Sequence, residues 1–220
     1  WLNKTYGSVS TFDKCPEDGK TAWPTIYSLI EGLQLEIGVK PGEISPNFGN
    51  KTSQYYDEKA TPKLINGYEG NLVYLIQGAF WCKGITPGGF DGVYSDYTRK
   101  AILELQGDAG FDPDGILNAM WAKSLFDMSA FVLVPGGDPK VREMQQKLNK
   151  NYHAYFGILP CDGIYQRDTN TALIYALQKA EGMKVGEANG VYGPSTTLKT
   201  PTLKEGDTSD FVEILQDALY

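Results

Sequence analysis

The chain has 220 residues, of which 41% are hydrophobic and 21% are charged, and its formal net charge is −7. This composition excludes a disordered acidic tail, because enough apolar residues are present to build packed cores. The negative charge argues against a general nucleic-acid binder and against a protein that lies on an anionic membrane, because both need a basic face. No apolar run approaches the roughly 18 residues that a membrane-spanning helix needs, and the opening residues show no signal-peptide pattern.

The first part of the chain predicts a turn, a helix and a second turn with a short helix. Asp18-Gly19 is typical of a tight turn in which the glycine takes a positive φ. Thr25, seven residues after the Asp, is expected to cap the following helix, which ends at Gly38. The second turn and short helix fall within residues 46–56.

Three further helices are predicted over 71–84, 138–152 and 207–220, and all three carry the pattern V-x-x-φ-Q-x-x-φ, where φ is an apolar residue. The apolar positions fall at i, i+3 and i+7, which is one face of a helix. The Gln lies beside that face, where it can bond to neighbouring backbone. The pattern comprises Val73, Ile76, Gln77, Phe80, Val141, Met144, Gln145, Leu148, Val212, Leu215, Gln216 and Leu219.

An Asp-Gly turn and a second helix follow the first two of these helices. Thr98 and Thr169 each lie seven residues after the Asp and are expected to cap the second helices. Those helices are predicted to end at Gly110 and Gly182, and each is followed by a further turn and a short helix. Upstream, the expected caps of the first helices are Asp138, and Asp207 or Thr208.

The repeated order of elements divides the chain into modules of about 60–70 residues. We predict modules at 1–62, with a truncated first helix, at 68–130 and at 138–202, and the first helix of an incomplete fourth at 206–220. The expected fold is mainly α, with tandem three-helix modules packed as a compact array. The chain is therefore expected to be a piece of a longer one. The last helix is expected to pack where the first helix of module 1 is missing, in the same chain or by self-association with a second copy.

The motifs resemble the bacterial peptidoglycan-binding domain of the three-helix type. The resemblance rests on V-x-x-L-Q-x-x-L, then D-G-x-[YF]-[GS]-x-x-T-x-x-A, then F-Q-x-x-x-G and D-G-x-x-G-x-x-T. The first copy departs from it, with Lys20-Thr21 after its turn and "NFGNKT" in place of the second turn. The longer pattern also looks like the N-terminal arrays of Gram-positive proteins that continue into a glycoside-hydrolase-like (lysozyme-like) barrel.

The resemblance implies a ligand, the cell-wall glycan and its peptide stem. An Asp-Gly turn at a helix N-terminus is expected to offer free N–H groups to a stem-peptide carboxylate, with Tyr and Thr side chains beside it. The alternative is that these residues serve only turn geometry, capping and packing. The predicted ligand-binding residues are Asp91, Gly92, Tyr94, Tyr97, Thr98, Asp162, Gly163, Tyr165, Arg167 and Thr169.

Catalysis, a metal and a cofactor are not expected in this chain. His153 is the single His and is placed in a loop, no G-x-S-x-G occurs, and no C-x-x-C suggests zinc. The three cysteines, Cys15, Cys82 and Cys161, are expected to be free, partly buried thiols. The expected function is a non-catalytic array that targets an attached hydrolase to an extracellular bacterial cell wall. The alternatives are a spacer without a ligand, or part of an autolysin or phage lysin whose catalytic domain lies outside this chain.

Overall fold

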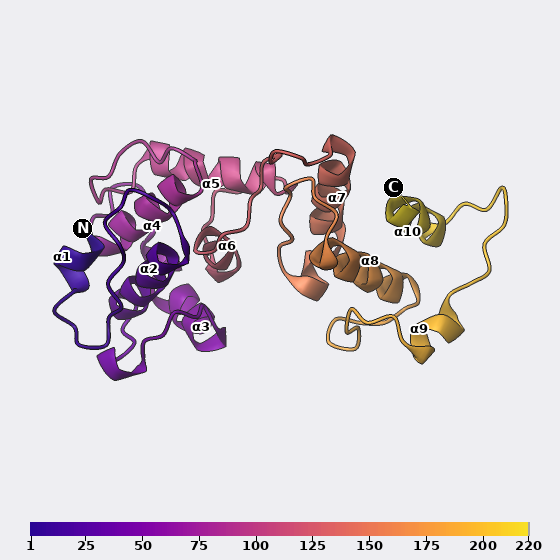
Figure 1. Cartoon of the computed structure of the whole chain (residues 1–220), viewed down its shortest axis with the longest axis horizontal. Helices are drawn as coiled ribbons and strands as arrows, with labels where there is room; N and C mark the ends of the chain where they lie inside the picture. The colour runs from indigo at the N-terminus through magenta and orange to yellow at the C-terminus, as the bar shows by residue number, and fades with distance from the viewer. Residues whose placement is uncertain (220) are drawn as a thin grey trace. The chain divides into compact units, whose positions relative to one another are not determined.

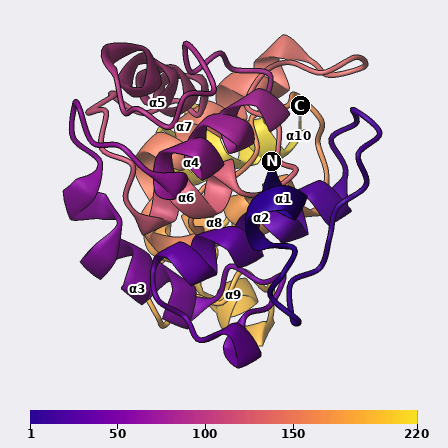
Figure 2. The same cartoon turned by 90° about the vertical axis from the view of Figure 1, so that its left-hand side faces the viewer.

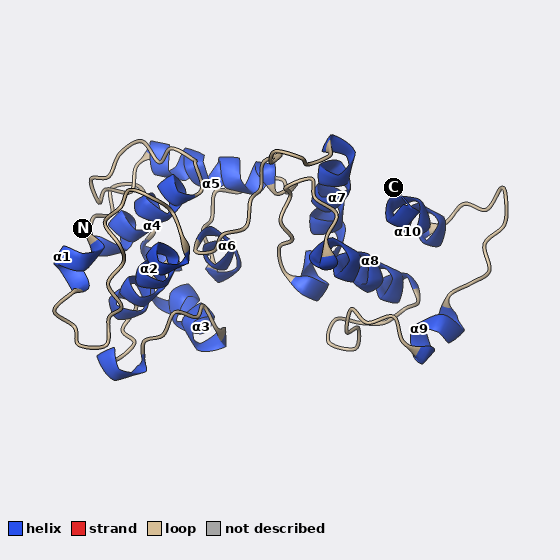
Figure 3. Cartoon of the chain, in the orientation of Figure 1, coloured by secondary structure: helices blue, strands red, loops and turns tan. Residues whose placement is uncertain are grey.

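The computed structural model describes residues 1–219, and it is mainly helical, which confirms the predicted fold class (Figure 1, Figure 3). Two 3₁₀ turns, Pro41–Glu43 and Thr61–Lys63, and one isolated bridge between Glu69 and Val93 complete the regular structure of the described residues. None of the described helices combines the length and the apolar character that a bilayer crossing requires. The α-helices are α1 (Leu2–Tyr6), α2 (Trp23–Glu36), α3 (Asn50–Lys59), α4 (Asn71–Cys82), α5 (Asp96–Asp108), α6 (Ala119–Leu125), α7 (Pro139–Phe156), α8 (Arg167–Ala180), α9 (Pro194–Lys199) and α10 (Asp210–Leu219).

The chain divides into two compact units. Unit 1 comprises residues 1–106 and 113–129, and unit 2 comprises residues 107–112 and everything from Ala130 onward. In unit 1, α2 packs against both α1 and α4, and α6 packs against α3 and α4 (Figure 2). Its core includes Ile26, Leu33, Ile76 and Phe80, none of which is measurably exposed. Burying each such side chain contributes about 1.5–3 kcal/mol.

Unit 2 is built on α7, α8 and α10. α8 packs against the other two, and Ile214 of α10 joins the apolar core that α7 and α8 form. Lys147 of α7 holds α10 through ion pairs with Glu213 at 2.6 Å and Asp217 at 2.9 Å. The expectation that residues 207–220 would fill the place of a missing helix in module 1 of the same chain is therefore wrong for the described residues, because α10 packs on α8. Self-association through this helix remains a prediction.

The helix ends follow the sequence signals in part. Asp138 caps α7, as predicted, by accepting a hydrogen bond from the N–H of Lys140. The glycines expected after the second helices, Gly38, Gly110 and Gly182, all have positive φ, between 87° and 89°. Since α10 begins at Asp210, neither Asp207 nor Thr208 is its cap.

The predicted threonine caps are wrong. Thr25, Thr98 and Thr169 are each the third residue of their helix, inside the first turn. Thr169 instead accepts a hydrogen bond from the Gln145 side chain at 3.1 Å. This position therefore serves a tertiary contact in α8, and the residues just before α2 and α8, Ala22 and Gln166, make no side-chain capping bond either.

Candidate ligand-binding sites

Each Asp-Gly turn after α4 is held by a glutamine side chain, an arrangement that we call the glutamine clasp. In the first example, Gln77 Oε1 accepts hydrogen bonds from the N–H groups of Asp91 at 3.1 Å and Gly92 at 2.9 Å. Gln77 Nε2 donates to Asp91 Oδ1 at 2.8 Å and to the Val93 carbonyl at 3.2 Å. The carboxylate also accepts from the N–H of Val93 at 3.0 Å. One amide therefore fixes the whole turn onto α4.

The described residues contain four such clasps in all, two in each unit. In every case the Gln oxygen accepts from the Gly N–H, and the Gln nitrogen donates both to the preceding Asp or Asn side chain and to the carbonyl two residues later. The further clasps join Gln106 to Asp114-Gly115, Gln145 to Asp162-Gly163, and Gln178 to Asn189-Gly190. The prediction that the Gln of the helical pattern bonds to backbone is confirmed at Gln77 and Gln145.

The clasp also overturns one expectation about the site. The N–H groups of Gly92 and Gly163 are buried and donate to Gln77 and Gln145, so they are not free for a ligand carboxylate. Gly92 has a φ of +71°, and a Cβ there would overlap the ring of Tyr74. Only glycine fits that position, for reasons of packing.

Several predicted site residues in the second module are interior ones. Tyr94 and Thr98 are buried, and burial raises the pKa of the Tyr94 hydroxyl. Asp91 is exposed, but the Gln77 side chain and the Val93 N–H lower its pKa by bonding to the carboxylate. Tyr97 alone presents a large open surface, being 64% exposed. The structure therefore brings Asp91 and Gly92 together within the clasp and leaves Tyr97 outside it.

The third module shows the same division. Gly163 and Thr169 are buried and Asp162 is half-buried, all three as partners of Gln145. Arg167, the first residue of α8, and Tyr165 are exposed. The Tyr165 hydroxyl lies 3.4 Å from the Asn170 side chain.

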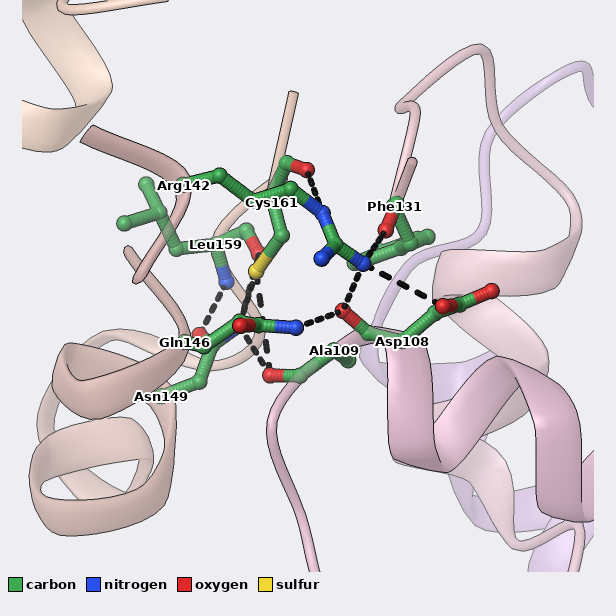
Figure 4. A network of polar contacts seen from close by, with 8 residues as sticks. All are labelled: Asp108, Ala109, Phe131, Arg142, Gln146, Asn149, Leu159 and Cys161. Carbon is green, nitrogen blue, oxygen red and sulfur yellow. Dashed lines mark hydrogen bonds and ion pairs between the residues drawn. The ribbon is translucent and has the colours of Figure 1, made fainter. Parts of the chain in front are cut away.

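A polar network in unit 2 is satisfied internally (Figure 4). Asn149 donates to the carbonyls of Ala109 at 3.0 Å and Leu159 at 2.8 Å, and Arg142 donates to the Phe131 carbonyl at 2.8 Å. Burial raises the pKa of the Cys161 thiol to about 12. A thiol that stays protonated is a poor nucleophile or metal ligand, so this network stabilises the fold.

Three further expectations concern reactive groups, namely the cysteines, His153 and a metal site. Cys15, Cys82 and Cys161 are all free thiols, as expected. His153 lies within α7 and not in a loop, so that expectation is wrong; its Nδ1 is 3.0 Å from the Asn149 carbonyl oxygen. Within residues 1–219, no three His, Cys, Asp or Glu side chains are grouped so that they could hold a metal ion.

Unit 1 contains a cavity of about 290 Å³ beside α4. One wall of it is made of aromatic side chains, and we call it the aromatic cavity. Trp1 stacks on Tyr74 with ring centroids 5.0 Å apart, and Trp81 stacks on Phe90 at 5.2 Å. Tyr74 and Phe90 meet edge to face at 5.0 Å. The remaining lining residues are Leu2, Asn3, Cys15, Pro16, Glu17, Thr25, Leu29, Gly78 and Cys82.

The sequence interpretation missed this cavity, although α4 carried a signal. Tyr74, Gly78 and Trp81 fall at i, i+4 and i+7, which is a second helical stripe beside the one that contains Gln77. A stripe of two aromatic residues around a glycine indicates a surface with a hollow. Phe90 comes directly before the turn at Asp91-Gly92, so the clasp that fixes this turn also places the Phe90 ring in the cavity wall.

Two segments of the chain match family models. Residues 69–125, which span α4 to α6, match a family described as "Putative peptidoglycan binding domain". Residues 134–220 match a family described as "FadG/YbfG, PGDB-like domain". A peptidoglycan-binding segment supports association with the cell wall and has no catalytic role of its own.

Relatives are found in Bacillus subtilis (strain 168). The chain is 47% identical over 222 residues to "Uncharacterized protein YbfG", and the match covers 100% of the chain and 30% of that protein. It is 39% identical over 225 residues to "Uncharacterized protein FadG", with 100% of the chain and 39% of that protein covered. No solved structure matches the chain. The chain thus contains a segment similar to peptidoglycan binding domains and spans less than half the length of either relative.

Proposed function

We propose that this chain is a non-catalytic array that binds peptidoglycan and holds an attached hydrolase at the bacterial cell wall. The match of residues 69–125 to a peptidoglycan binding domain carries the proposal. The raised pKa of the buried Cys161 thiol agrees with a chain in which this cysteine has no catalytic role. In the wall of a Gram-positive bacterium the ligand is abundant and outside the cell, so the array would act there.

The proposal that the chain targets a hydrolase rests on the greater length of its relatives. The chain covers 30% and 39% of its two relatives, so proteins of this kind have room for a domain that cuts the wall. A repetitive polymer offers many equivalent sites to such a protein. Two units on one chain, each with a weak site, would then hold it more tightly than either alone through their high effective concentration.

A structural spacer is the second candidate, and a specific observation favours it. The side chains of Gln77 and Gln145 form hydrogen bonds with polar groups of the predicted turn residues, which are Asp91, Gly92, Asp162 and Gly163. If no other surface bound a ligand, the clasps would serve only to stabilise the fold of a spacer between the wall and a catalytic domain.

Co-sedimentation with insoluble Gram-positive peptidoglycan separates these functions. The purified chain would be mixed with sacculi, with and without soluble muropeptides, while turbidity is followed in the same tube. Binding that muropeptides compete away, without clearing, is the result that we expect. Clearing would mean that the chain is itself a hydrolase, and the absence of binding would leave the spacer as the better account.

A further inference from the structure

We propose that the aromatic cavity of unit 1 binds a sugar ring of the glycan strand. This inference rests on the proposed function and deepens it, since it assigns the ligand to a surface outside the predicted Asp-Gly site. Trp81 is 52% exposed, although it is a large apolar side chain stacked on the ring of Phe90. Aromatic faces left open at a concave surface are typical of a ligand site.

The shape of the cavity suits a ring-shaped ligand. Gly78 lies in the middle of the α4 stripe between Tyr74 and Trp81, and its missing side chain leaves the floor open. A Cβ at Gly78 would lie 3.5 Å from Phe90 and 3.7 Å from Leu29, which is ordinary contact. A volume of about 290 Å³ is at the lower limit for small-molecule pockets, so the cavity fits one sugar ring better than a peptide.

The polar rim supplies acceptors for hydroxyl groups. Asn3 Nδ2 donates to Glu17 Oε1 at 2.8 Å and to the Cys15 carbonyl at 2.9 Å, so the amide holds the carboxylate at the mouth of the cavity. Glu17 is exposed, and a carboxylate has more acceptor sites than this one bond uses. Sugar hydroxyls can donate to them while the apolar face of the ring lies on the aromatic side chains.

The charge at the cavity argues against the stem peptide as its occupant. Glu17 lines it, and no Lys or Arg side chain of the described residues does. A carboxylate at the end of a stem peptide would be repelled by Glu17 and would find no Lys or Arg side chain in the lining. An uncharged N-acetylated hexosamine meets neither obstacle, so the glycan strand is the part of peptidoglycan that this surface favours.

The test uses the whole chain and the trimer of N-acetylglucosamine as a soluble probe, with affinity measured by calorimetry. We expect Trp81→Ala to weaken binding about tenfold or more, as loss of an aromatic anchor does, and Trp81→Phe to retain most of it. Gly78→Ala should also weaken binding by filling the floor of the cavity. Because alanine favours a helix over glycine, that variant should melt no lower than the wild type.

Trp23→Ala is the matched control, because Trp23 is a 49% exposed Trp of unit 1 that does not line the cavity. It should bind the trimer as the wild type does. If the wild type bound sacculi but Trp81→Ala and Gly78→Ala bound the trimer and the sacculi equally well, the cavity proposal would be overturned while the proposed function stood. If the wild type bound no sacculi, the proposed function itself would fail, and this inference with it.

Discussion

α4 and α10 carry the same pattern of residues and have different surroundings. In α4, Ile76, Gln77 and Phe80 are all buried. At the matching positions of α10, Leu215 is 44% exposed and Leu219 is 76% exposed. Both helices bury one face against an earlier helix of the same unit, α2 for α4 and α8 for α10. The difference lies in the second face, which an Asp-Gly turn covers in α4 and which no turn of the described residues covers in α10.

This comparison shows that the pattern specifies a helix and its apolar positions but not the burial of those positions. Gln77 bonds to the turn at Asp91-Gly92, whereas Gln216 is exposed. The turn is therefore the element that completes the core around α4. The following substitutions compare the two helices position by position.

The largest effect is expected at the apolar position before the Gln. Ile76→Ala should lower the free energy of unfolding of unit 1 by about 2–5 kcal/mol, because it leaves a cavity among fully buried side chains. Leu215→Ala, the matched variant in α10, should cost less than about 1 kcal/mol. Hydrogen exchange of the most protected amides in each unit measures both values. Equal losses would mean that the two faces are covered alike.

The next effect is expected at the Gln itself. Gln77→Met leaves the buried N–H of Gly92 and the carbonyl of Val93 without their partner, at a cost of about 1–3 kcal/mol. Gln216→Met should change stability by less than about 0.5 kcal/mol. The same hydrogen-exchange experiment applies. A neutral Gln77→Met would contradict the structural role given to the clasp.

The smallest effect is expected at the ion pairs that hold α10. Partial burial lowers the pKa of Lys147, but the bonds to Glu213 and Asp217 outweigh it and raise the pKa above its ordinary value of 10.5. The raised pKa means that its contribution is complete below that value and is lost as pH rises through the folded pKa. Lys147→Met should lower the protection of α10 amides about fivefold at pH 7, consistent with about 1 kcal/mol for a partly exposed pair.

Lys150→Met serves as the control for that substitution, since Lys150 pairs with Asp112 and not with α10. Protection of α10 should be unchanged in this variant. If Lys147→Met also left α10 as protected as in the wild type, the ion pairs would have no part in docking the helix, and its apolar packing against α8 would account for it.

Much of the fold could be predicted from the sequence, because it depends on local signals. The apolar periodicity predicted α4 and α7, and Asp138 predicted the start of α7. The threonine caps were wrong because the distance of seven residues from the Asp to the Thr does not fix where the helix begins. The same Thr can stand just before the helix or inside its first turn. What distinguishes them is the Gln145 bond to Thr169, a contact across 24 positions of the chain.

The candidate site was harder to predict, because its atoms are used or assembled by tertiary contacts. The N–H groups of the Asp-Gly turns look free in the sequence, and only the approach of a Gln from another helix shows that they are occupied. The aromatic cavity joins Trp1, Tyr74 and Phe90 from three separate segments. The module boundaries and the ligand-binding role of Tyr97, Tyr165 and Arg167 remain predictions.

The most direct test of this account is hydrogen exchange of the whole chain with and without soluble muropeptides, resolved to single segments. We predict added protection around Trp1, residues 15–17 and 74–82, and no change at the clasped turns 91–93 and 162–164. Protection centred on those turns would contradict the structural role of the clasps. The absence of protection anywhere would contradict binding of the cell wall.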